Sequence, residues 1–282
     1  MKKLYPIMLS LLLVYFSFYY TNKVVDIIRS KDPIMMKIKK EKENYEVKTK
    51  NAKISGDKII PGKNGKKVNV NQSFIKMKKY GEYNESLYVF DEVEPEIKID
   101  DYYDKYIENG SQKDNKVSLV FHVNRFDNID RIVDTINLNE IKVTMFMDGL
   151  FIDNNRKKVA EINEKGHELE LLSYNDAYNK EEFIEGLHSL FYITNKAPKY
   201  CYSEYDNKNV LELCNSLDMH TIVPSINANN NSFNTIKKRL TNGSIISLSN
   251  DDKYLNTIIN YIKQRGYKIV TLDELISEEL EK

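Results

Sequence analysis

Apolar segments of two alternating kinds fill the chain from Lys116 to near its C-terminus. Short runs rich in Val, Ile, Leu and Phe have the composition of buried strands, and between them apolar residues recur at helical spacing. This alternation predicts an α/β fold with a parallel sheet, open or closed into a barrel, and a functional site at the C-terminal ends of the strands. The strands are expected at 117–121, 143–147, 169–172, 200–202, 221–223, 245–248 and 268–271, and the helices near 129–136, 159–162, 183–191, 210–217 and 255–262.

The N-terminus carries a second signal. Lys2 and Lys3 precede an uncharged run at residues 4–20, LYPIMLSLLLVYFSFYY. Its length lies at the lower edge of a membrane span, and the two lysines would stay in the cytoplasm. The run ends in Phe-Tyr-Tyr-Thr, a poor cleavage site, so an uncleaved anchor is favoured over a removed signal peptide. We therefore expect a single-pass protein of the cell membrane whose C-terminal domain is extracytoplasmic, or a secreted protein if the leader is cleaved.

The composition predicts four domains along the chain. Residues 1–22 are the membrane anchor or signal segment. Residues 23–50, dense in Lys and Glu, are expected to form a solvated charged stalk. Residues 51–110 contain apolar pairs between turn signals, a helical pattern near 73–79 and a strand-like run at 87–90, which predict a small α+β module followed by a linker. Residues 111–282 form the alternating domain.

Charge and cysteine content exclude some partners. The 42 Lys and Arg residues balance the 42 Asp and Glu residues, and a nucleic-acid-binding protein would have a basic excess. The two cysteines, Cys201 and Cys214, form no C-x-x-C pair, so a cysteine zinc site is excluded. We expect both to be small buried or half-buried side chains rather than a disulfide.

Six segments of the alternating region resemble, in order and at natural spacing, the motifs of the NodB-homology polysaccharide deacetylases. The first, KVSLVFHVNR at 116–125, corresponds to an apolar strand that ends in T-F-D-D-G-P in the family. Another, KGHELELLSYND at 165–176, is similar to K-G-H-E-I-G-N-H-S-Y-S-H. The others are IKVTMFMDG, APKYCYSEYD, GSIISLSN and the final RGYKIVTLDELI. The resemblance covers residues 116–278 and implies a distorted (β/α) barrel of the polysaccharide deacetylase type.

The resemblance also implies an activity and a set of site positions. The family removes the acetyl group from N-acetylated sugars in chitin-like chains or peptidoglycan. It uses a divalent metal such as zinc held by one Asp and two His, a second Asp as base and a later His as acid. Matched residue by residue, the base position is His122, the three metal positions are Val123, Leu172 and Asp176, the acid position is Ser249, and the Arg and proline positions of the third motif hold Tyr202, Ser203 and Glu204.

These replacements predict an emptied site. A catalytic zinc needs about three protein ligands, and Val and Leu cannot bind a metal at all. We therefore expect no catalytic residue, no metal ligand set and no cofactor. Asp148, at the end of a predicted strand, is either a further cleft residue or a helix cap. The expected vestigial cleft positions are His122, Val123, Asp148, Leu172, Asp176, Tyr202, Glu204 and Ser249.

Three functions remain open from the sequence. The first is a membrane-anchored, inactive deacetylase-like protein that binds peptidoglycan, another cell-surface polysaccharide or an envelope partner. The second is an active deacetylase with an atypical site built on His122 and Asp176. The third is a structural assembly module. Convergence of His122, Asp148, Asp176 and Glu204 would favour the second, and a filled apolar cleft would favour the third. The other histidines, His167, His188 and His220, are expected to have structural, surface or packing roles.

Overall fold

The computed structural model describes residues 4–112, 114–124, 127, 129–228, 232–250 and 253–280. The chain forms two compact units, and each contains two stretches of sequence. Unit 1 consists of Met1–Thr49 and Asn64–Glu94, and unit 2 of Lys50–Lys63 and Pro95–Lys282. The segment 51–110, predicted to be one module with a linker, is instead divided between the two units.

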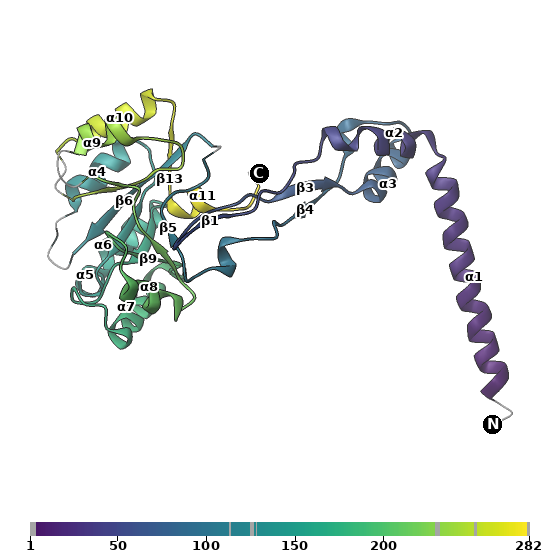
Figure 1. The fold of residues 1–282 in the computed structure, drawn as a ribbon, viewed down its shortest axis with the longest axis horizontal. Coiled ribbons are helices and arrows are strands. Elements are labelled where there is room, and N and C mark those ends of the chain that lie inside the picture. The colour runs from purple at the N-terminus through teal and green to yellow at the C-terminus, as the bar shows by residue number, and fades with distance from the viewer. Residues whose placement is uncertain are drawn as a thin grey trace. The chain divides into compact units, whose positions relative to one another are not determined.

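Unit 1 is built from helices α1 to α3 and a two-stranded antiparallel sheet (Figure 1). Its elements are α1 (Leu4–Ser30), α2 (Pro33–Glu41), η1 (Lys42–Asn44), β3 (Gly65–Val68), α3 (Val70–Tyr80), η2 (Glu85–Leu87) and β4 (Phe90–Val93). The strand predicted at 87–90 begins later, because residues 85–87 form a short 3-10 helix.

The predicted charged stalk is partly a core element. Asp32 begins α2 by accepting a hydrogen bond from the Ile34 amide, and Met35 and Ile38 are buried on one face of that helix. They pack with Phe74 and Met77 of α3 in the apolar core of unit 1. The lysines and glutamates that suggested a solvated stalk thus form the outer face of an amphipathic helix.

The N-terminal helix was predicted to span a membrane. In the part of the chain that the structure describes, no helix combines the length and the apolar character required of a membrane span.

Unit 2 is an α/β fold with parallel sheets, as the alternation predicted. The six-stranded sheet has the order β11 (Ile226–Asn227), β12 (Ile245–Leu248), β6 (Lys116–Val123), β7 (Thr144–Met147), β8 (Glu168–Leu171), and β13 (Lys268–Val270) also pairs with β6. The second sheet has the order β1 (Lys53–Ser55), β2 (Lys58–Ile60), β5 (Tyr106–Ile107), β10 (His220–Ile222), β9 (Tyr200–Tyr202), and only β1 and β2 are antiparallel. Strands β1, β2 and β5 come from sequence that was assigned to the module and linker.

The helices of unit 2 follow the strands in the expected alternation. They are η3 (Ile99–Asp101), α4 (Asp130–Leu138), α5 (Gly149–Asn154), α6 (Arg156–Glu164), α7 (Lys180–Thr194), α8 (Lys208–Asn215), α9 (Ser232–Arg239), α10 (Leu255–Gln264) and α11 (Leu272–Ile276). The sequence pattern missed α5 and α9. The side chain that caps α8 is that of Asn207.

The side chain of Glu170 joins the two sheets of unit 2 at β8 and β9, between which there is no backbone pairing. Strands β8 and β9 are edge strands of different sheets. The buried Glu170 carboxylate on β8 accepts hydrogen bonds from the amides of Lys199 (2.8 Å) and Tyr200 (3.0 Å) at the start of β9. Burial raises the pKa of Glu170 well above its ordinary range. The barrel expected from the sequence is thus two parallel sheets held together here by a carboxylate.

Central strand β6 is buried on both faces, and its alternation assigns residues to two cores. Leu119, Phe121 and Val123 belong to the core between the sheet and its helices. Val120 belongs to the core that the two sheets enclose, together with Phe146 and Tyr202. Successive side chains of a strand point to opposite faces, so His122 lies on the Val120 side and Val123 does not.

The two cysteines form a disulfide, which corrects the expectation of two separate thiols. Cys201 on β9 is bonded to Cys214 in the last turn of α8, and both side chains are fully buried. No local sequence pattern indicates that β9 and α8 bring the two cysteines together.

Removal of this disulfide is expected to destabilise unit 2. It closes a short loop, since the cysteines are 13 residues apart, and such a loop restricts the unfolded chain by about 3 kcal/mol. We expect Cys201→Ala/Cys214→Ala to lower the free energy of unfolding by about that amount, measured by urea denaturation. Equal stability of the variant and the oxidised wild type would contradict the prediction.

A second prediction concerns pH. Burial raises the pKa of Glu168 from 4.5 to about 7, and the carboxylate accepts hydrogen bonds from the Thr144 hydroxyl and the amides of Leu272 and Asp273. The folded protein keeps this proton to higher pH than the unfolded chain does. The stabilisation is therefore complete below pH 4.5 and is lost as the pH rises through 7, at a cost of up to about 3 kcal/mol.

The variant Glu168→Gln keeps an acceptor for these donors but cannot ionise. Its free energy of unfolding, measured from pH 5 to pH 8, is expected to fall less with rising pH than that of the wild type. An unchanged pH dependence in the variant would show that Glu168 is not the titrating group.

Candidate functional site

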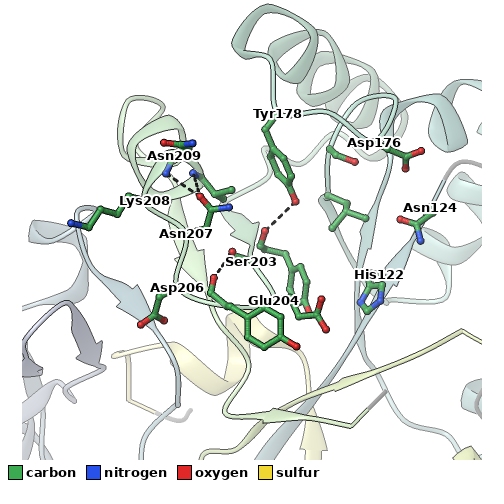
Figure 2. Close-up of a pocket in the computed structure, with 15 residues that line it drawn as sticks. His122, Asn124, Asp176, Tyr178, Ser203, Glu204, Asp206, Asn207, Lys208 and Asn209 are labelled. Atoms are coloured by element: carbon green, nitrogen blue, oxygen red, sulfur yellow. Dashed lines mark hydrogen bonds between the residues drawn. The ribbon is translucent and has the colours of Figure 1, made fainter. Parts of the chain in front are cut away.

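A cavity of about 620 Å³ opens at the C-terminal ends of β6, β8 and β9 (Figure 2). Side chains from the ends of these strands and from the loops that follow them form its walls. The lining residues are His122, Asn124, Leu172, Ser173, Asp176, Tyr178, Tyr202, Ser203, Glu204, Tyr205, Asp206, Asn207, Lys208, Asn209 and Val210. The cavity lies where the sequence predicted a site for this class of fold.

The cavity contains five of the eight predicted cleft residues. They are His122, Leu172, Asp176, Tyr202 and Glu204. Val123, Asp148 and Ser249 do not line it, for reasons that differ. Val123 has no exposed surface and packs between the sheet and the helices, because β6 continues as a regular strand through this residue. Ser249 follows the end of β12, where the next residue, Asn250, donates hydrogen bonds to the His122 carbonyl and to Asp127.

Asp148 is a buried structural residue. Its carboxylate begins α5 by accepting a hydrogen bond from the Leu150 amide (3.0 Å), which is the capping role considered from the sequence. It also accepts from the Ser173 hydroxyl (2.7 Å) and the Asp176 amide (3.0 Å). Asn175 and Asp176 both have left-handed backbone conformations, so the carboxylate holds a strained turn. Asp148 therefore positions the loop that carries Asp176.

The His122 side chain lines the cavity. Its ring packs against Tyr202, with 5.5 Å between the ring centroids. Burial lowers the pKa of His122, and the opposing effects of Glu204 and Asp127 are smaller, so the imidazole is neutral near pH 7. Its Nδ1 atom is buried and has no hydrogen-bond partner, so no contact at that nitrogen orients the ring for proton transfer.

The floor of the cavity is mainly apolar. Leu172 and Tyr202 are almost fully buried in the inner core. The Tyr202 ring lies 5.3 Å from that of Phe146, and its hydroxyl is 2.9 Å from that of Ser247. Burial raises the pKa of Tyr202, which keeps this hydroxyl protonated.

These residues do not fit a divalent metal. Leu172 contributes only carbon atoms, Val123 faces the other core, and Asp176 is the one carboxylate among the three matched metal positions. Across the described ranges of the chain, no group of three or more His, Cys, Asp or Glu side chains could hold a metal ion. Metal-assisted hydrolysis therefore has no ligand set among the described residues.

One wall of the cavity comes from the β9–α8 segment, residues 203–210. The Ser203 hydroxyl donates to the Tyr205 carbonyl (2.6 Å), and Glu204 accepts from the Asn227 amide group (2.6 Å). Asn207 caps α8 through the amides of Asn209 and Val210. On the opposite wall, Tyr178 donates to the Tyr202 carbonyl at 3.5 Å (Figure 2).

The remaining histidines have the packing or surface roles that were expected. His167 is buried and contacts Asn137, and burial lowers its pKa to about 4. His220 is buried, contacts Asp100 at 3.0 Å and stacks on Tyr103. His188 is an exposed residue of α7. None of the three lines the cavity.

The role of Asp148 can be tested by substitution. Asp148→Ala leaves the Ser173 hydroxyl and the Leu150 and Asp176 amides without their acceptor, and we expect it to lower the free energy of unfolding by about 3 kcal/mol. The control Ser173→Ala removes only one of these bonds and is expected to cost about 1 kcal/mol. Urea denaturation compares the two, and equal losses would contradict the positioning role.

Comparison with known proteins agrees with this geometry. The sequence profile of the polysaccharide deacetylase family matches residues 109–270. The protein YlxY of Bacillus subtilis is 26% identical over 280 residues, which cover 90% of this chain and 86% of YlxY.

The fold is similar to several solved structures. BA3943 of Bacillus anthracis, described as a CE4 family pseudoenzyme, has a TM-score of 0.66 and 21% identity, with 89% of this chain and 97% of that chain covered. The Bacillus subtilis family 4 carbohydrate esterase PdaA has a TM-score of 0.54 and 18% identity, with 62% and 86% covered. At these identities the likeness concerns the fold.

Proposed function

The chain belongs to the polysaccharide deacetylase family, and we propose that it is an inactive member whose cavity binds a glycan of the cell envelope. One observation carries this proposal. The cavity at the strand ends is open, while two of the three matched metal positions are Leu172 and the core residue Val123. The binding space of a deacetylase is thus present without the groups that activate water.

The open cavity argues against a purely structural role. A module with a purely structural role would not require an open cavity lined by polar and aromatic side chains, and larger apolar side chains at its floor could fill the space. Tyr178 and Tyr205 are both exposed at the cavity, and such rings offer flat apolar faces with a polar tip. Faces of this kind suit the apolar faces of sugar rings, and the neighbouring hydroxyl, amide and carboxylate groups suit their hydroxyls.

The geometry also disfavours an atypical active site built on His122 and Asp176. Asp148 is buried away from the cavity, so His122, Asp148, Asp176 and Glu204 do not form one cluster. The Nδ1 atom of His122 has no hydrogen-bond partner that would orient its ring as a base, and the ring packs against Tyr202. The relative BA3943, with a similar fold, is itself described as a pseudoenzyme, which supports the same interpretation.

We also propose that the protein acts outside the cytoplasm, attached to the membrane by its N-terminus. Disulfides such as Cys201–Cys214 form and persist mainly in oxidising compartments. The uncharged run at residues 4–20, preceded by Lys2 and Lys3, supports attachment. Fractionation of cells tests this: the full-length chain should sediment with membranes and resist extraction by high salt, and recovery in the salt extract would contradict it.

Activity and binding are tested on the same preparation. Full-length protein with zinc or cobalt is incubated with acetylated chitooligosaccharide and with peptidoglycan. We expect no metal-dependent acetate release and retention of the protein on insoluble peptidoglycan. Metal-dependent release of acetate would overturn the proposed inactivity. If the protein binds neither chitooligosaccharide nor peptidoglycan, the proposed glycan binding is overturned.

A matched pair of variants locates the binding site. Tyr205 is 68% exposed and lines the cavity, whereas Tyr192 on α7 is 83% exposed and does not line it. We expect Tyr205→Ala to weaken glycan binding about tenfold through lost stacking, and Tyr192→Ala to leave it unchanged. Equal effects of the two substitutions in a titration with chitooligosaccharide would place binding elsewhere.

A further inference from the structure

The wall of the cavity between β9 and α8 has an unusual construction. Every residue from 203 to 210 lines the cavity, and the strand residue Tyr202 before them forms part of the floor. The strands that carry the matched metal and base positions, β6 and β8, supply fewer lining residues with their loops. Much of the surface that a ligand would meet therefore comes from one continuous segment.

The disulfide holds both ends of this segment. Cys201 lies directly before the floor residue Tyr202 and pairs with Thr221 in the sheet. Cys214 lies in α8, just after the wall, and both cysteines are packed in the core between sheet and helices. The covalent bond thus fixes the distance between β9 and α8, the two elements that the wall connects.

The wall has little apolar burial of its own. Residues 204–209 are all exposed, and Val210 is the first buried residue after Ser203. Local polar contacts shape it: Ser203 with the Tyr205 carbonyl, Glu204 with Asn227, and the Asn207 cap of α8. Contacts of this exposed kind are individually weak, so the conformation of the wall depends on where its two ends are held.

We infer that the segment between Cys201 and Cys214 determines which glycan the cavity accepts, and that the disulfide is what makes this segment competent to bind. The inference rests on the proposed glycan-binding function. Both sulfurs are fully buried, so a reductant cannot reach them in the folded protein. The disulfide is therefore a brace acquired once, during oxidative folding, and a chain that folded in a reducing compartment would have the cavity without an ordered wall.

The brace is tested on full-length protein with Cys201→Ala/Cys214→Ala and with the double serine variant, which separates loss of the bond from loss of packing. Two quantities are measured: affinity for chitooligosaccharide and for peptidoglycan fragments, and amide hydrogen exchange along the chain. If the unbraced wall is competent in about one molecule in ten, affinity falls about tenfold. We expect that loss in both variants, together with a rise in exchange at residues 203–210 that exceeds the uniform rise in β6 and β7 caused by the lower stability of unit 2.

A second variant tests the wall with the brace intact. Tyr205→Ala/Lys208→Ala changes only exposed side chains and leaves the Glu204–Asn227 contact in place, so the wall should keep its conformation. We expect it to bind chitooligosaccharide at least as weakly as the cysteine variants while its exchange matches the wild type. Binding equal to the wild type would show that the segment does not determine the ligand.

The remaining outcomes are decisive too. Unchanged affinity in both cysteine variants, or exchange that rises by the same factor at residues 203–210 as in β6 and β7, would overturn the local role of the disulfide. If the wild type binds neither glycan, the proposed function fails. The exchange comparison then still decides whether the disulfide orders residues 203–210.

Discussion

The two sheets of unit 2 meet at β8 and β9, and the site depends on how they are joined there. Glu170 makes the join by accepting two amides from the start of β9, in a place where neither strand has a partner strand from the other sheet. A buried carboxylate is costly unless donors compensate it, and here the backbone of the neighbouring strand supplies them. The cavity opens at the other end of these two strands, with Leu172 on one side and Tyr202 on the other. The carboxylate therefore sets the separation of the strands on which the floor of the cavity is built.

Loss of the metal positions and retention of the cavity are physically consistent. A metal-binding histidine left at position 172 without its metal would bury ring nitrogens that lack a partner in the inner core. Leucine at position 172 removes that cost and joins the apolar cluster around Tyr202 and Phe146. The buried Asp148 carboxylate, by contrast, accepts hydrogen bonds from several donors. These bonds compensate its burial and stabilise the turn at Asn175 and Asp176. The scaffold of the site is thus stabilised by interactions that do not involve the lost chemistry.

The sequence predicted the parts of the fold that depend on local patterns. Strand runs such as 143–147 and 245–248 are buried, and burial leaves a readable apolar signature. The resemblance to the family motifs assigned His122, Leu172 and Asp176 to the site, and all three line the cavity. What the sequence missed depends on distant parts of the chain. Residues 50–63 form strands of the second sheet in unit 2, although the residues that follow them, 64–94, belong to unit 1. No local sequence pattern indicates this division.

Two errors in the predicted site have the same origin. Val123 was placed in the cleft because it matches the metal-binding Asp of the family motif, although the phase of β6 is set by what packs on each face. The disulfide was judged less favoured than two thiols because the distance between β9 and α8 cannot be read from spacing. Asp148 shows the converse, since the sequence left its role open between cap and cleft, and hydrogen bonds to residues more than 20 positions away decide it.

The phase of β6 has a consequence for the chemistry of the cavity. An aspartate introduced at position 123 would point into the core between sheet and helices, among side chains such as Phe121 and Ile129, rather than toward the cavity. Because Val123 is the last residue of β6, a local bulge at the end of the strand would be needed to turn a ligand there toward the cavity. A substitution at position 123 alone therefore changes the core between sheet and helices and leaves the lining of the cavity as it is. The chemistry of this cavity is thus decided by the backbone at the end of one strand as much as by the side chains that it carries.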